Sequence, residues 1–252
     1  MEPLTLVLLV GGAVAAGWVD AVIGGGGLIL IPLILASFPH LAPATALGTN
    51  KVAGVMGTSA AAVTMLRRIR PNPYVVGSYL PIALLAAGAG AGCASLLSAE
   101  VMRPVIIVLM LAVGVFVACR PSFGAQEAQR VVTPRRIVLA GIAVAVVGFY
   151  DGIFGPGTGM FLIMAFTVVF SQSFVESAVM AKLINVSTNL GALVVFAAGG
   201  HVWLTLGLAL AVANMVGAYL GARTVLGGGA RLVRYAVLTV VVVMSTYLIF
   251  QG

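Results

Sequence analysis

The chain has 252 residues, of which 62% are hydrophobic and 8% are charged, and its formal net charge is +7. A mean hydropathy of +1.19 leaves too few polar residues to cover a water-soluble fold, so lipid is predicted to be the main solvent. We expect no nucleic-acid partner, because the basic residues fall in short connections between apolar segments, where they set membrane topology. Cys93 and Cys119 each sit in an apolar run without a CxxC motif or neighbouring histidines. We interpret them as buried packing residues and expect neither a metal nor another cofactor.

Taken in chain order, eight hydrophobic segments cover residues 4–38, 44–66, 75–97, 103–119, 137–171, 176–198, 203–224 and 232–250. Most have the roughly 20 residues that cross a bilayer as a helix, which predicts an all-α polytopic membrane protein. We expect one transmembrane domain over residues 1–252, with a first repeat at 4–119, a cytoplasmic linker at 120–136 and a second repeat at 137–250. The start of the chain carries Glu2 and no basic residue, so it lacks the n-region of a cleaved signal peptide.

The first and fifth segments are too long for one ordinary crossing and too short for two. Glycines interrupt each of them, at residues 24–27 and 155–159. Such backbone is tolerated at membrane depth only where protein buries it or water lines it. Each segment is therefore either one tilted, broken crossing or a hairpin of two half-helices that enters and leaves on one side.

The placement of the arginines favours hairpins. With two hairpins, ten of the eleven arginines lie on one side of the membrane and only Arg103 lies opposite, whereas single crossings would divide them eight against three. The positive-inside tendency therefore predicts hairpins, both termini outside, and a second half inverted relative to the first. The ten are Arg67, Arg68, Arg70, Arg120, Arg130, Arg135, Arg136, Arg223, Arg231 and Arg234.

The two halves also share residues at a fixed spacing. Four residues recur 131 positions later: Asp20, Gly24, Gly26 and Lys51 as Asp151, Gly155, Gly157 and Lys182. Two related halves, each with a broken hydrophobic helix and an intramembrane cation, are typical of secondary transporters.

The two lysines lie inside apolar spans, where a charged side chain costs about 2.5–3.5 kcal/mol at the bilayer centre. One interpretation is that their long stems carry the ammonium groups to the membrane interface. The other is a pair of cations flanking an anion site. On a helix Lys182, Asn185 and Asn189 share one face, and Lys51, Gly54 and Thr58 hold the same positions in the first half.

The glycine breaks serve either as hinges or as the starts of half-helices, whose free N–H groups and partial positive charge suit an anionic group. Asp20 and Asp151 precede the breaks by four residues. They are either structural, neutralising a lysine or capping a helix, or proton carriers.

These motifs together resemble the TauE/SafE (TSUP) family of sulfite and organosulfonate exporters, over nearly the whole chain. The resemblance rests on residues 19–27, 44–51, 152–159 and 181–189. It implies a permease of the bacterial or archaeal inner membrane that moves sulfite, sulfoacetate or similar small anions. Gly27 departs from it, since many relatives have a polar or bulkier residue there.

We therefore predict a secondary transporter and not an enzyme. Its predicted partners are the lipid bilayer and a small anion, and a homodimer is a further possibility. A channel is one alternative. A membrane-embedded enzyme is another, because Tyr150-Asp151 is similar to one half of the signature of intramembrane aspartyl proteases. The partner motif GxGD is absent from the sequence, as are HExxH and GxSxG. The predicted substrate-binding residues are Gly24, Gly25, Gly26, Gly27, Thr49, Asn50, Lys51, Gly155, Gly157, Thr158, Gly159, Lys182, Asn185 and Asn189, with Asp20 and Asp151 as coupling or structural carboxylates.

Overall fold

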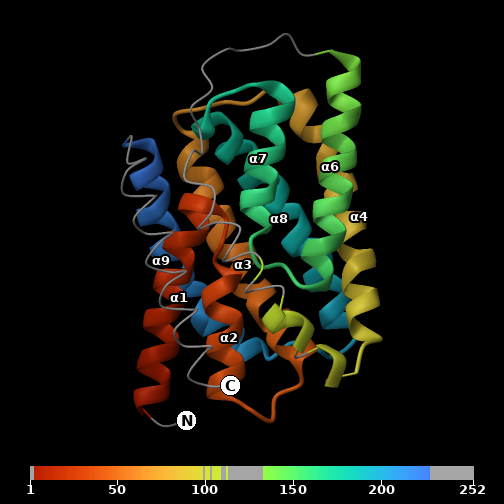
Figure 1. The fold of residues 1–252 in the computed structure, drawn as a ribbon. Coiled ribbons are helices and arrows are strands. Elements are labelled where there is room, and N and C mark those ends of the chain that lie inside the picture. The colour runs from red at the N-terminus through yellow and green to blue at the C-terminus, as the bar shows by residue number, and fades with distance from the viewer. Residues whose placement is uncertain (1–2, 99, 103, 109–111, 113–132, 228–252) are drawn as a thin grey trace.

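The computed structural model describes residues 3–98, 100–102, 104–108, 112 and 133–227. Within these residues all regular structure is helical (Figure 1). The predicted last segment at 232–250, Cys119, and five of the arginines (Arg103, Arg120, Arg130, Arg231 and Arg234) lie outside the described residues. Eight helices have described bounds: α1 (Pro3–Ile23), α2 (Gly27–Ser37), α3 (Pro43–Leu66), α4 (Pro73–Ser95), α6 (Pro134–Ile153), α7 (Thr158–Phe170), α8 (Phe174–Ala198) and α9 (Leu204–Leu226).

Local sequence explains where several helices begin. α3, α4 and α6 each start with a proline, whose missing N–H costs nothing in the first helical turn. α8 starts with a capping box between Ser173 and Glu176. Five helices are long and apolar enough to cross a membrane, namely α1, α4, α6, α8 and α9. α3 has 24 residues but is more polar, because it carries Thr49, Asn50 and Lys51.

Both broken segments are hairpins. α2 returns to the end of the molecule at which α1 begins, and α7 returns to the opposite end, at which α6 begins (Figure 1). The arms are unequal, however: α1 and α6 have 21 and 20 residues, whereas α2 and α7 have 11 and 13. The first arms are therefore longer than the expected half-helices, because a mostly apolar run of 21 or 20 residues precedes the glycines in each.

The two halves interlock. α9 packs against α1 and α3, and α4 packs against α6 and α8, while α3 and α8 contact each other. Glycines permit this close approach: a Cβ on Gly217 of α9 would lie 1.9 Å from the Val14 carbonyl of α1. In α4 the close contact is made by Gly90, not by the GxxxG pair of Gly88 and Gly92, since a Cβ on Gly92 would meet nothing within 4 Å.

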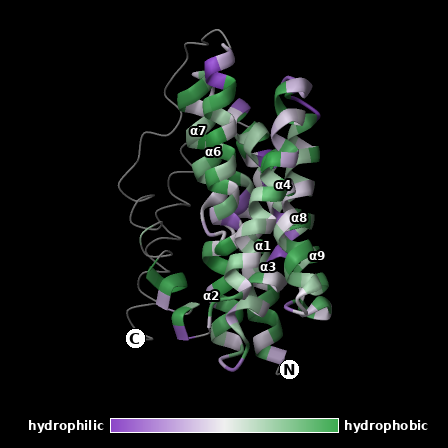
Figure 2. Ribbon diagram, turned by 90° about the vertical axis from the view of Figure 1, so that its right-hand side faces the viewer, coloured by the Kyte–Doolittle hydropathy of each residue, from purple (hydrophilic) through white to green (hydrophobic). Residues whose placement is uncertain are grey.

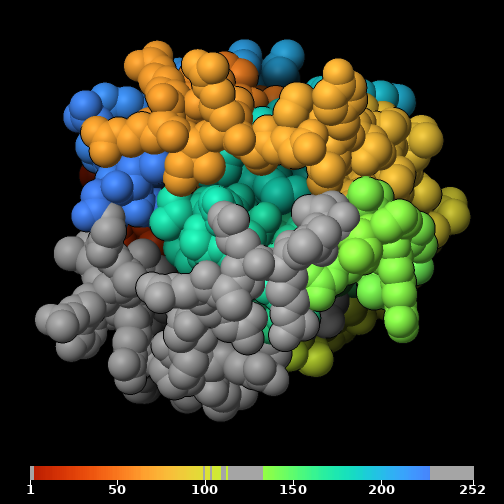
Figure 3. All heavy atoms as spheres, turned by 90° about the horizontal axis from the view of Figure 1, so that it is seen from above, coloured from red at the N-terminus to blue at the C-terminus, as the bar shows by residue number. Residues whose placement is uncertain are grey.

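The helices are mostly hydrophobic along their length, with hydrophilic residues at their ends and at a few places midway (Figure 2). Many large apolar side chains are exposed on the outside of the described helices. Cys93 lies on this exposed surface, so the expectation that it is buried is wrong. Viewed from above, α7 lies between the α3–α4 connection, the start of α6 and the end of α9 (Figure 3). Arg67 and Arg68 share a surface hollow at this end with Arg223 of α9.

Candidate functional site

The two glycine breaks meet in the middle of the molecule. Gly24 has a left-handed φ of 79°, and a Cβ there would lie 2.3 Å from the backbone of Gly159. A Cβ on Gly159 would in turn lie 2.5 Å from the Cα of Gly24. The two backbones thus touch directly, which no residue larger than glycine would allow.

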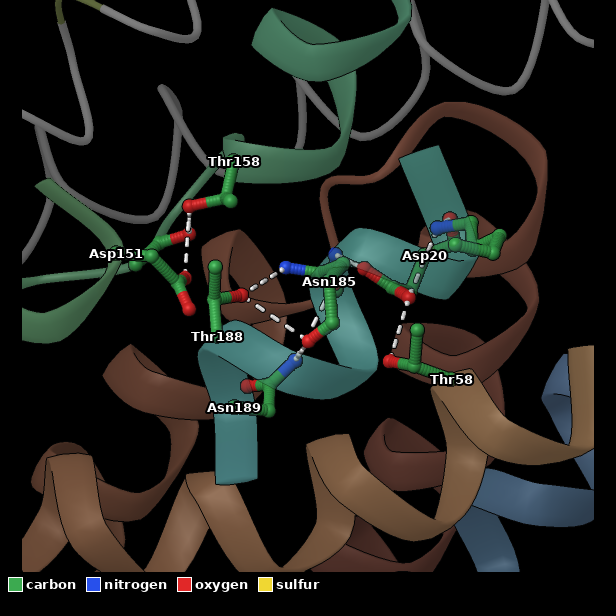
Figure 4. Close-up of polar contacts among 10 residues, drawn as sticks. Asp20, Thr58, Asp151, Thr158, Asn185, Thr188 and Asn189 are labelled. Atoms are coloured by element: carbon green, nitrogen blue, oxygen red, sulfur yellow. Dashed lines mark hydrogen bonds and ion pairs between the residues drawn. The ribbon is translucent and has the colours of Figure 1, made fainter. Parts of the chain in front are cut away.

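A small polar cavity of about 30 Å³ lies beside this contact. Twelve of its lining residues are predicted binding residues or coupling carboxylates: Asp20, Gly24, Gly26, Gly27, Asn50, Lys51, Asp151, Gly155, Thr158, Gly159, Asn185 and Asn189. Gly54 and Thr58 also line it, on the face of α3 that carries Lys51, and Asn214 joins from α9. Figure 4 shows that these carboxylates, hydroxyls and amides come from both halves of the chain.

The lysines pair with carboxylates across the halves. Lys51 Nζ lies 2.8 Å from Asp151 Oδ2, and Lys182 Nζ lies 3.0 Å from Asp20 Oδ2. The Lys51 and Lys182 side chains are only 2% and 0% exposed, so the alternative that they reach the membrane interface is wrong. Each half thus supplies the anion that neutralises the cation of the other, which offsets the cost of removing these charges from water.

Polar side chains of α8 form one wall of the cavity. The Asn185 amide donates to Thr188 Oγ1 at 3.1 Å, and the Asn189 amide donates to the Asn185 carbonyl oxygen at 2.8 Å (Figure 4). Asn214 of α9 donates to the Ala13 carbonyl oxygen at 3.2 Å, so it both joins α9 to α1 and lines the cavity. The sequence signal for Asn214 is a polar residue inside an apolar span, which predicts an interhelical hydrogen bond first and a place in the pore lining second; the structure shows both.

Four predicted binding residues do not line the cavity: Gly25, Thr49, Gly157 and Lys182. Thr49 lies on another face of α3, where its Oγ1 accepts the Trp203 N–H at 3.0 Å. Lys182 lies behind Asp20 and donates to both its carboxylate and its carbonyl oxygen. Gly157, at a φ of 81°, provides the left-handed turn that starts α7.

The breaks also present backbone donors. Among the described residues, the N–H groups of Gly27 and Gly155 donate to no acceptor, and both glycines line the cavity. Gly27 is the first residue of α2, so the partial positive charge of that helix N-terminus faces the same space. The site thus combines hydroxyl, amide and backbone donors with one cavity-facing ammonium group.

A polar centre enclosed by apolar helices and built from two broken hairpins is typical of a multi-pass membrane protein. The family model described as sulfite exporter TauE/SafE matches residues 9–248, so the chain belongs to the TauE/SafE family of membrane transporters and is not an enzyme.

Curated bacterial relatives cover nearly the whole chain. A probable membrane transporter protein, YfcA, from Escherichia coli strain K12 is 34% identical over 100% of this chain and 92% of its own length. The probable membrane transporter protein ORF9 of Sinorhizobium sp. is 32% identical over 97% of this chain and 92% of its own. A probable membrane transporter protein of Haemophilus influenzae is 30% identical over 94% and 91%. No solved structure matches the chain.

Proposed function

We propose that the protein is a secondary transporter that moves small oxyanions, sulfite or organosulfonates, across the bacterial inner membrane by alternating access. The observation that carries this proposal is the cavity at the contact of the two breaks, where Lys51 meets free N–H groups, hydroxyls and amides. Donors of these kinds are what an oxyanion requires. The sulfur chemistry rests on membership of the family.

The size of the cavity supports a conformational change. A volume of about 30 Å³ has room for about one or two water molecules, so even a small oxyanion requires the walls to move apart. The contact between Gly24 and Gly159 is a place where such movement can begin, because it joins the two hairpins by backbone alone.

The packing supports the second half as an inverted copy of the first. By position in the repeat, α1 corresponds to α6 and α4 corresponds to α9. The contact of α1 with α9 therefore has a counterpart in the contact of α6 with α4, and both pairs pack closely. The same exchange of halves turns the Lys51–Asp151 ion pair into the Lys182–Asp20 ion pair. Two halves of opposite orientation give two conformations of similar energy that open to opposite sides, as alternating access requires.

We further propose that the end carrying Arg67, Arg68, Arg135, Arg136 and Arg223 faces the cytoplasm, which places both termini outside. An inside-negative potential then favours the exit of an anion by about 2.3 kcal/mol per charge per 100 mV. Export without another driving ion is therefore physically feasible.

The test is uptake of radiolabelled sulfite and sulfoacetate into proteoliposomes at a set pH gradient and membrane potential. We expect saturable flux for the wild type and a loss of at least tenfold for Lys51→Met. Because that variant leaves Asp151 unpaired and buried, Lys51→Met/Asp151→Asn serves as the charge-matched control for folding.

Normal flux in a folded Lys51→Met/Asp151→Asn variant would contradict the anion site. Flux that does not saturate, with currents far above the turnover of a carrier, would show a channel instead.

A further inference from the structure

The two ion pairs differ in how their lysines are bound. The Lys182 ammonium donates to two acceptors, the carboxylate and the carbonyl oxygen of Asp20, and does not line the cavity. Lys51 lines the cavity, and within the described part of the chain its ammonium has one ionic partner, Asp151, and donates no hydrogen bond. An ammonium group has three donors, so Lys51 keeps donors for a ligand whereas Lys182 is held in place.

The two carboxylates also differ in how many polar partners they have. Asp20 Oδ1 accepts the Gly26 N–H at 3.3 Å, and Oδ2 accepts the Thr58 hydroxyl at 3.4 Å in addition to Lys182. Asp20 thus has three polar partners for its carboxylate. Asp151 Oδ2 is buried, accepts no hydrogen bond and contacts Lys51 alone among the described residues.

The remaining oxygen of Asp151 meets a group that suits either protonation state. Thr158 Oγ1 lies 2.7 Å from Asp151 Oδ1 and 2.8 Å from the Gly155 carbonyl oxygen. A hydroxyl both donates and accepts. When Asp151 is charged, Thr158 donates to it. When Asp151 is protonated, its O–H donates to Thr158, which then donates to Gly155. The first half has Gly27 at the position that corresponds to Thr158 and therefore lacks this hydroxyl.

We infer that Asp151 takes up one proton when an anion binds Lys51, while the Asp20–Lys182 pair keeps a structural role. The inference rests on the proposed function. The incoming anion takes the ammonium from Asp151, and a buried carboxylate that loses its cation is stabilised by protonation. One anion and one proton therefore enter the site together and leave it together, and the net charge of the site is conserved for a monovalent anion.

Other titratable groups on the elements around Asp151 are already engaged or distant. On α6 itself, the neighbouring Tyr150 hydroxyl donates to the Pro156 carbonyl oxygen. On α4, Tyr79 donates to the Ile137 carbonyl oxygen at the other end of α6, and Cys93 is exposed. α7 carries no titratable side chain. On α8, Glu176 caps the helix and Lys182 binds Asp20, which lies on α1.

The experiment measures anion binding and proton uptake together on the purified full-length protein. Sulfoacetate is the probe, because its two acidic groups stay ionised above about pH 6. Calorimetry gives its affinity between about pH 6 and about pH 8.5, and a pH indicator in weak buffer counts the protons. We expect about one proton per anion in the wild type, and an affinity that falls about tenfold per pH unit at the alkaline end.

Asp151→Asn and Asp20→Asn are the matched variants. We expect Asp151→Asn to bind sulfoacetate with no proton uptake and with an affinity that changes less than twofold over the same pH range. We expect Asp20→Asn to lower the thermal midpoint while proton uptake stays near one per bound anion. Asp151→Glu restores a titratable group and is expected to restore the uptake.

Proton uptake that persists in Asp151→Asn, or that Asp20→Asn alone abolishes, would overturn the inference. So would sulfoacetate binding to the wild type without proton uptake, whether or not the variants fold, and that result would leave the proposed anion site intact. If neither sulfoacetate nor sulfite binds, the proposed function fails and this inference fails with it.

Discussion

At the scale of single residues, the contact between Gly24 and Gly159 is the most sterically demanding feature of the site. A Cβ on Gly24 would lie 2.3 Å from the Gly159 Cα, and a Cβ on Gly159 would lie 2.5 Å from the Gly24 Cα. Neither side of the contact is a flexible side chain, so local repacking cannot relieve an added methyl group. The two hairpins would have to separate.

We therefore expect Gly159→Ala to destabilise the protein by about 1–3 kcal/mol, as overpacking does elsewhere, and to reduce transport severely. The matched control is Gly25→Ala in the first break, where the nearest atom to the new Cβ would be the mobile Leu28 Cδ1 at 3.3 Å. Thermal midpoints in detergent and proteoliposome flux measure both effects. Equal midpoints for the two variants would show that the close contact does not constrain the fold.

The sequence predicts most of the residues that line the cavity but not which carboxylate pairs with which lysine. The spacing of 131 residues identifies both carboxylates, both lysines and the glycines, because a repeat preserves what the site requires. The exchange of partners between Lys51 and Lys182 depends on how the halves pack, which no local pattern encodes. For the same reason Thr49 was predicted at the cavity, although its side chain points to Trp203 from another face of α3.

At the scale of helices, the contact between α1 and α9 depends on glycines in both. A Cβ on Gly17 of α1 would lie 2.1 Å from the Asn214 carbonyl oxygen, and Gly217 meets Val14 as closely. In lipid, such close approach supplies packing energy that the hydrophobic effect does not provide. Asn214 adds a hydrogen bond to α1 at the same contact.

We expect Gly217→Ala to lower the thermal midpoint, with a cost of about 1–3 kcal/mol. Gly92→Ala in α4 is the control, because its Cβ would meet nothing within 4 Å and alanine favours the helix. The thermal midpoints of the two purified variants are compared by measuring the fraction of monodisperse protein that remains after heating. A Gly92→Ala variant as unstable as Gly217→Ala would indicate that α4 has a partner at that face.

Helix positions were largely predictable, and helix surroundings were not. Apolar runs and prolines predict the ends of α3, α4 and α8 to within a few residues. An apolar run does not say whether a given side chain faces lipid or protein, since both are apolar. That is why the sequence predicts Cys93 as buried although it is exposed.

At the scale of the whole molecule, all six arginines among the described residues fall at helix ends or in connections, and the hairpins bring Arg223 to the end that carries Arg67 and Arg68. This arrangement gives the orientation a direct test.

In a Cys93→Ser/Cys119→Ser background, we expect His40→Cys to react with a membrane-impermeant maleimide from outside intact cells. Arg68→Cys and Arg223→Cys should react only in inverted vesicles. Labelling of Arg68→Cys in intact cells would reverse the proposed orientation, and opposite sides for Arg68→Cys and Arg223→Cys would contradict the hairpins.

The interlocking of the halves has a consequence for how the chain is made. A ribosome releases α1 and α3 into the bilayer long before it synthesises α9, which begins at Leu204 and supplies the surface against which both pack. Until then Gly17 of α1 and Gly57 of α3 lack the contact with Asn214 that they make in the fold. Nearly the whole polypeptide must therefore leave the ribosome before α1, which meets α2 and α3 earlier, reaches α9. Premature termination anywhere upstream of Leu204 yields a fragment that quality-control proteases can recognise.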